Sequence, residues 1–139
     1  MARLTSQQAN ELANNFSVIG QAVLDYMIQN YDNLSKLQYQ KFRDLHRAIL
    51  NYSDDLYALS AIVIIDDIQT ALLTIGNVTA EIKDTYKTLQ NIQKAIDVSV
   101  SVVNLGAALF SKNPQAVADS ISRLVATWKS KPKKKIKIY

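Results

Sequence analysis

Two adjacent acids and a single histidine are the residues whose types could support chemistry in this chain of 139 residues. A hydrolase with paired carboxylates needs two acids in a cleft, which nothing in the sequence marks, and a Ser-His-Asp triad would need the single histidine, His46. The surrounding patterns support neither role, because the chain lacks Gly-x-Ser-x-Gly, a phosphate-binding glycine loop and a Glu-x-x-His pair. Since it also has no cysteine, the sequence predicts a non-enzymatic protein with no metal site and no cofactor.

The two acids interrupt a long apolar stretch that runs from Leu56 to Ile75. One interpretation is that the buried face of a helix rotates at this point, so that both carboxylates point into water. The other is that Asp66 and Asp67 keep an otherwise membrane-competent helix in solution, since an ionised Asp at the centre of a bilayer costs about 2.5–3.5 kcal/mol. The sequence alone leaves both interpretations open.

His46 lies beside an apolar stripe and has Arg43 and Arg47 as basic neighbours. We expect it to be a surface residue at the edge of that stripe. The alternative is a pH switch, because the ordinary pKa of histidine is about 6.5.

The elements that must position these residues are predicted to be helices. Only three glycines and two prolines occur, and apolar residues recur at steps of three and four through most of the chain. Thr5 with Gln8 forms a capping-box pattern, and Asn113 before Pro114 marks another helix start. Gly76 is expected to end a helix. The expected helices cover residues 6–31, 35–75, 79–110 and 114–128, with Asn33 or Ser35 as the cap of the second.

These helices predict an all-α fold: an elongated four-helix bundle with a long second helix and a flexible basic C-terminal tail. We expect a single domain over residues 1–128 and a lysine-rich tail over residues 129–139. Alternating valine and serine residues over 97–102 also fit a strand. We favour a helix there, because the segment continues a longer helical stripe without turn residues before it.

Two segments are apolar on more than one face, residues 56–75 and the uncharged residues 98–111. A body of about 128 residues has few surfaces on which to bury them, which favours self-association. The leading prediction is therefore a helical interaction module that self-associates through apolar stripes. The alternative is a membrane-active bundle that inserts residues 56–75 and 92–110. The residues expected to form the assembly or membrane surface are Ile62, Ile65, Asp66, Asp67, Leu72, Val103, Gly106 and Phe110.

Residues 95–117 contain a Gly/Ala-rich apolar helix, the Asn113-Pro114 turn that follows it, and the start of the next amphipathic helix. This segment resembles parts of helical-bundle toxins of the α-pore-forming kind and related uncharacterised bacterial proteins. The resemblance covers about a fifth of the chain. It implies a soluble bundle that can expose an apolar hairpin and assemble on membranes, and it assigns no role to any single residue.

The net charge of +4 is unevenly distributed. Residues 1–128 hold ten basic and twelve acidic residues, so the body carries a net charge of −2. The tail could contact anionic lipid or the phosphates of a nucleic acid, or it could serve only solubility. Nucleic-acid binding through the tail is the third prediction for function. The tail contributes six lysines and no acid: Lys129, Lys131, Lys133, Lys134, Lys135 and Lys137.

The first 16 residues lack the apolar core of a secretion signal, and no run of 18 apolar residues occurs. We therefore expect a cytoplasmic protein, with membrane association as the alternative. The expected partner is a second copy or another helical protein. An anionic membrane is also possible, and a nucleic acid is the least favoured partner.

Overall fold

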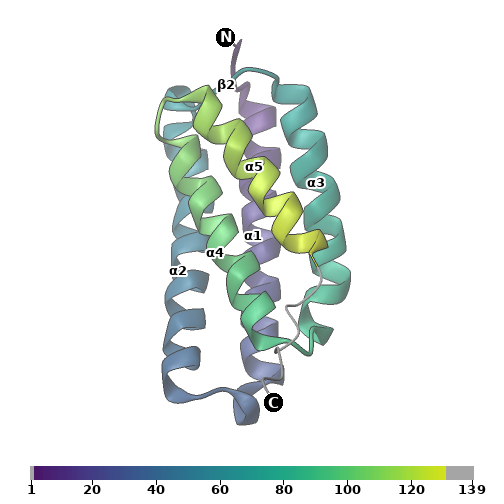
Figure 1. Ribbon diagram of the computed structural model, residues 1–139. Coiled ribbons are helices and arrows are strands. Elements are labelled where there is room, and N and C mark those ends of the chain that lie inside the picture. The colour runs from purple at the N-terminus through teal and green to yellow at the C-terminus, as the bar shows by residue number, and fades with distance from the viewer. Residues whose placement is uncertain (1, 131–139) are drawn as a thin grey trace.

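Five helices lie side by side along one axis within residues 2–130, the part of the chain that the computed structural model describes (Figure 1). Short 3-10 turns follow α1, α2 and α3. Two short strands, β1 (Ala2–Arg3) and β2 (Ile64–Ile65), pair antiparallel at one end of the bundle. The helices are α1 (Ser6–Gln29), α2 (Lys36–Leu59), α3 (Ile68–Thr85), α4 (Ile92–Leu109) and α5 (Pro114–Lys129).

Local sequence chemistry sets the starts of three helices. Thr5 and Gln8 form a reciprocal capping box at the start of α1, and Ser35 forms the same arrangement with Gln38 at the start of α2. The side chain of Asn113 accepts from backbone N–H groups of the first turn of α5. These caps and the all-α class confirm the sequence predictions.

The expected continuous helix over residues 35–75 is wrong. After α2 ends at Leu59, the chain makes a 3-10 turn, pairs as β2 with β1, and enters α3 only after Asp67. Residues 62–65 are four consecutive β-branched residues, which fit an extended backbone better than a helix. Asp67 then caps α3 by accepting from the backbone N–H of Thr70. The four-helix bundle with a long second helix is thus replaced by five shorter helices.

The expected helix over residues 79–110 is also divided. α3 passes through Gly76 without ending and stops at Thr85, and a 3-10 turn at Tyr86–Thr88 leads to Asn91, which caps α4. The competing strand over residues 97–102 does not form, because this segment lies inside α4.

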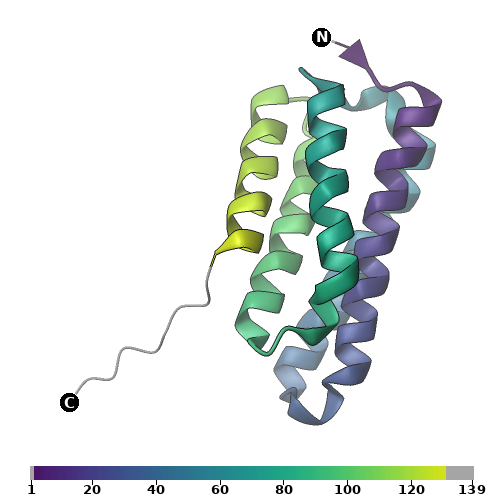
Figure 2. The same cartoon turned by 90° about the vertical axis from the view of Figure 1, so that its right-hand side faces the viewer.

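The core follows the apolar stripes. All five stripe positions of α1 are buried, as expected: Leu12, Phe16, Ile19, Val23 and Tyr26. α3 lies between α1 and α5 (Figure 2). α5 packs chiefly on α4, and α2 packs chiefly on α1 and then on α4.

Two side-chain-to-backbone hydrogen bonds fix the register of α1 against α2. The Ser53 hydroxyl donates to the carbonyl of Ala13 at 2.8 Å, and His46 Nδ1 lies 2.9 Å from the carbonyl of Gly20. Ala13 and Gly20 are seven residues apart on α1, and His46 and Ser53 are seven residues apart on α2, so the two bonds are separated by two helical turns. The surface position expected for His46 is therefore only partly right, because its ring is half-buried and contacts α1.

Candidate functional site

Close packing joins α2 to α4 around Gly106. A Cβ added at Gly106 would overlap the ring of Tyr52, so only a glycine fits the present approach of these two helices. The rings of Tyr52 and Phe110 stack with centroids 6.2 Å apart. Gly106 and Phe110, predicted as assembly or membrane residues, therefore already have a partner within the chain.

Two tyrosines, Tyr26 and Tyr86, place polar hydroxyl groups inside the bundle. The Tyr86 hydroxyl donates to the carbonyl of Ala95 at 2.8 Å and also bonds Ser99. Burial raises the pKa of Tyr86, which keeps the phenol neutral. Burial also raises the pKa of Tyr26, whose hydroxyl has no hydrogen-bond partner among residues 2–130. The rings of Tyr26 and Tyr86 lie edge to face with centroids 5.3 Å apart, so the pair joins α1 to the turn after α3.

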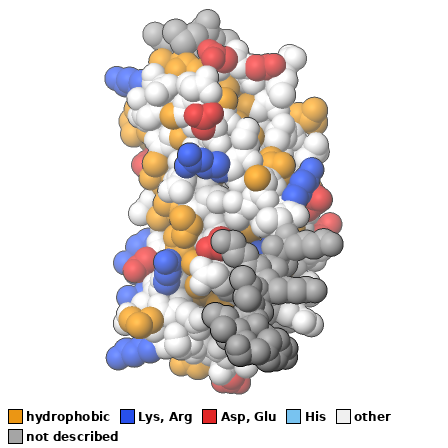
Figure 3. All heavy atoms as spheres, viewed as in Figure 1, with side chains coloured by type: hydrophobic (Ala, Val, Ile, Leu, Met, Phe, Trp, Pro, Cys, Tyr) orange, Lys and Arg blue, Asp and Glu red, His pale blue; other side chains and the backbone are white. Residues whose placement is uncertain are grey.

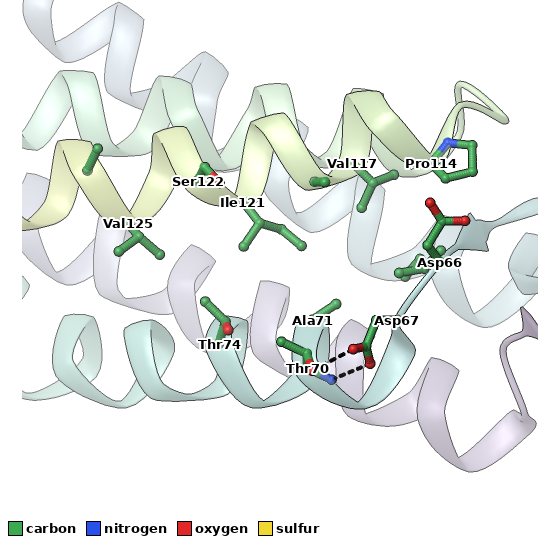
Figure 4. Close-up of a pocket in the computed structure, with 13 residues that line it drawn as sticks. Asp66, Asp67, Thr70, Ala71, Thr74, Pro114, Val117, Ile121, Ser122 and Val125 are labelled. Carbon is green, nitrogen blue, oxygen red and sulfur yellow. Dashed lines mark hydrogen bonds between the residues drawn. The ribbon is translucent and has the colours of Figure 1, made fainter.

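An open groove separates α3 from α5 (Figure 4). Its volume is about 510 Å³, within the range of about 300–1,000 Å³ that is usual for ligand and partner pockets. No Lys or Arg belongs to its lining within the described residues. Its walls and floor are mainly apolar and include Ile65, Ala71, Pro114, Val117, Ile121 and Val125.

Two acids mark the end of the groove at which α3 and α5 begin. Asp67 accepts from the backbone N–H of Thr70 at 3.0 Å and from the Thr70 hydroxyl at 2.8 Å. These two bonds lower the pKa of Asp67, the backbone bond having the larger effect. The carboxylate of Asp66 points toward Pro114 instead (Figure 4). Both acids are exposed, and their carboxylates point in different directions (Figure 4).

The eight residues predicted for an assembly or membrane surface do not form one surface. Ile65 and the two acids line the groove, whereas Leu72 is buried in the core and Val103 is half-buried against it. Ile62 is 37% exposed at the end of the bundle.

Sequence reasoning did not identify the α5 wall of the groove. Val117 and Ile121 belong to an apolar stripe at steps of four and three along this helix, which by itself predicts core packing. With Ala118 and Val125 they line the groove on the α5 side. The apolar Ala118 and Val125, which lie outside that stripe, were the available signal.

One large apolar side chain lies beside the groove. Leu73 is 66% exposed on α3, and it neighbours the groove-lining Thr70 because residues three apart are adjacent on a helix surface. Figure 3 shows other apolar side chains scattered over one face of the bundle rather than gathered into one patch.

Five of the six tail lysines lie outside the described residues, so the structure says nothing of the lipid or nucleic-acid contacts expected for them. Lys129 is exposed in the last turn of α5. The expected flexibility of the tail likewise falls outside the described range.

Within residues 2–130, α4 is the one helix long and apolar enough to cross a membrane, with a mean hydropathy of 1.2. Half of it is buried in the bundle, as in the core helix of a folded domain. Comparison of the chain with protein-family models, with curated proteins and with solved structures finds no match. The resemblance to helical-bundle toxins therefore depends on residues 95–117 alone.

Proposed function

We propose that the protein is a non-enzymatic helical interaction module that self-associates through the groove between α3 and α5. The observation that carries this proposal is the open apolar lining of the groove. Water against such a lining is unfavourable, and a partner that covers it gains the free energy of apolar burial. The apolar stripes of the five helices pack mainly within the chain, whereas the lining of the groove stays open, which supports docking there.

A second copy fits the groove because the chain offers a complementary side chain beside it. Leu73 projects from the helix that forms one wall. In a dimer with two-fold symmetry, Leu73 of each copy would enter the groove of the other, since the same patch serves both subunits. The body carries a net charge of only −2, so mutual repulsion between copies is small.

Sedimentation velocity across a wide range of protein concentration tests this proposal. We expect the wild-type mass to rise with concentration. Ala118→Glu places a charge in the groove and should keep the protein monomeric, because an ionised group would be buried without a partner. Leu73→Asp should have the same effect.

Two matched controls use residues of the same type outside the groove. Ala80→Glu changes an exposed alanine of α3 that does not line the groove. Leu37→Asp changes a leucine that is 79% exposed near the start of α2. Both variants should associate as the wild type does. A wild-type protein that stays monomeric, or equal loss in the controls, would contradict self-association through this groove.

Membrane insertion is the second candidate function, and the observation that favours it is the composition of α4. Insertion would require α4 to leave its contacts with Tyr52 and Tyr86. Flotation with anionic liposomes at neutral and acid pH tests it. Flotation with dye release would support insertion, and protein that stays at the bottom of the gradient at both pH values would exclude it.

A further inference from the structure

We propose that residues 131–139 of the same chain fold back into the groove between α3 and α5, so that a second copy must displace them in order to dock. This inference rests on the proposed role of the groove as the docking surface. It identifies the occupant by its chemistry: a short lysine-rich segment in which lysine and isoleucine alternate over residues 135–138.

The lining of the groove and the chemistry of the segment are complementary. The groove is mainly apolar, has Asp66 and Asp67 at one end, and contains no Lys or Arg within the described residues. Residues 135–138 read Lys-Ile-Lys-Ile. Because successive side chains of an extended chain point to opposite sides, Ile136 and Ile138 can face the groove while the lysines face water and the two acids.

The position of the segment in the chain also suits this site. It follows Ser130, one turn beyond Ala126 and Val125 at the end of the groove farthest from the acids. The path back to Pro114 spans about 24 Å along α5, at about 1.5 Å per residue. Nine extended residues reach about 30 Å, which allows a turn after Ser130 and still leaves enough length to follow the groove.

Linkage to the folded body further favours the chain's own segment over a free peptide. A segment attached at Ser130 is present at an effective concentration in the millimolar range, so even weak contacts hold it. Each exposed Lys–Asp contact contributes little, and burial of the two isoleucines supplies most of the stabilisation.

The absence of cysteine from the chain permits a direct test in the full-length protein. The variant Ala118→Cys/Tyr139→Cys places one thiol in the groove and one at the end of the segment. We expect its disulfide to form within one chain about tenfold faster than in a control, if docked segments outnumber undocked ones by that factor. The control is Ala80→Cys/Tyr139→Cys, whose first thiol is exposed on α3 outside the groove. Mixing isotope-labelled and unlabelled protein before oxidation separates links within a chain from links between chains by mass.

Two further double substitutions test which contacts hold residues 131–139 in the groove. In the Ala118→Cys/Tyr139→Cys background, Ile136→Ser/Ile138→Ser should slow the link to the control rate. Asp66→Asn/Asp67→Asn should slow it less, and the slowing should vanish in high salt, where charge contacts are screened. Asn at position 67 preserves a good helix cap.

Equal rates for the groove and control pairs would overturn the inference, as would links that form only between chains. Loss of the faster rate of Ala118→Cys/Tyr139→Cys on adding anionic vesicles or duplex DNA, with that rate restored by their removal, would support docking that is displaced by anions. Failure here is separable from failure of the proposed function. A fast internal link in a protein that stays monomeric even after residues 131–139 are removed contradicts self-association and supports the segment as the occupant. A dimer without that link contradicts the occupant and keeps self-association.

Discussion

The contact between α2 and α4 and the contact between α3 and α5 differ in how completely they are filled. At the first, Gly106 meets the ring of Tyr52 so closely that no added carbon fits. At the second, a groove of about 510 Å³ stays open. The same bundle therefore contains one tight helix contact and one loose helix contact. The apolar surface between α2 and α4 is buried by folding, whereas part of the apolar surface between α3 and α5 remains open to a partner.

Gly106→Ala should have the largest effect on stability. The added methyl group has no room beside Tyr52, so the free energy of unfolding should fall by about 1–3 kcal/mol. Urea denaturation followed by circular dichroism measures this change from the shift in the midpoint.

The matched control for that variant is Gly76→Ala. Gly76 lies inside α3, and an added Cβ would meet nothing within 4 Å. Alanine is the better helix former, so this variant should gain about 0.5–1 kcal/mol. A stability loss at Gly76, or none at Gly106, would contradict the close packing assigned to α2 and α4.

Ser53→Ala should have the next largest effect. It removes the buried hydroxyl that bonds the carbonyl of Ala13 and helps set the register of α1 against α2. The expected loss is about 0.5–1.5 kcal/mol, measured by the same denaturation. Ser17→Ala, at an exposed site on α1, has the same effect on helix propensity and no such bond, so it should not lose stability.

Ser122→Leu tests the loose contact directly. The groove has room for the larger side chain, so the free energy of unfolding should change by no more than about 0.5 kcal/mol. A loss as large as that of Gly106→Ala would mean that the groove is closed in solution. Thermal unfolding of Ser122→Leu and Gly106→Ala, each measured against wild type, compares the two changes in stability.

Asp67→Ala removes the cap of α3, and its effect on stability should depend on pH. The bonds from Thr70 lower the pKa of Asp67 below its ordinary value of 3.8, so the folded state holds the carboxylate ionised. That contribution to stability is present at neutral pH and is lost as the pH falls through the lowered pKa. The difference in Tm between wild type and variant should therefore shrink below about pH 4.

The control for this pH dependence is Asp67→Asn. The amide oxygen still accepts from the backbone N–H of Thr70 and does not titrate in this range. Its difference from wild type at neutral pH should be smaller than that of Asp67→Ala. A Tm difference for Asp67→Ala that stays constant down to pH 2 would show that the charge of Asp67 does not contribute.

Prediction from sequence succeeded where a few neighbouring residues decide the outcome. The capping boxes at Thr5 and Ser35 and the Asn113-Pro114 start are local hydrogen-bond patterns. It was wrong at residues 60–67, where a rotation of the buried face of one continuous helix was expected although the chain leaves the helix. The β-branched run over residues 62–65 was the local signal for that break, and pairing with Ala2–Arg3 is a contact across more than 60 residues that periodicity does not report.

The sequence by itself determined the all-α class, most of the buried stripes and the absence of any motif for known catalytic chemistry, because these depend on residue type and spacing along one chain. Tertiary structure alone decided that Gly106 and Phe110 face Tyr52, that His46 contacts the backbone of α1, and that two apolar faces leave a groove beside Asp66. The physical reason is that a stripe specifies which side of a helix is buried. The distance at which two helices pack depends on the side chains that both of them bring to the contact.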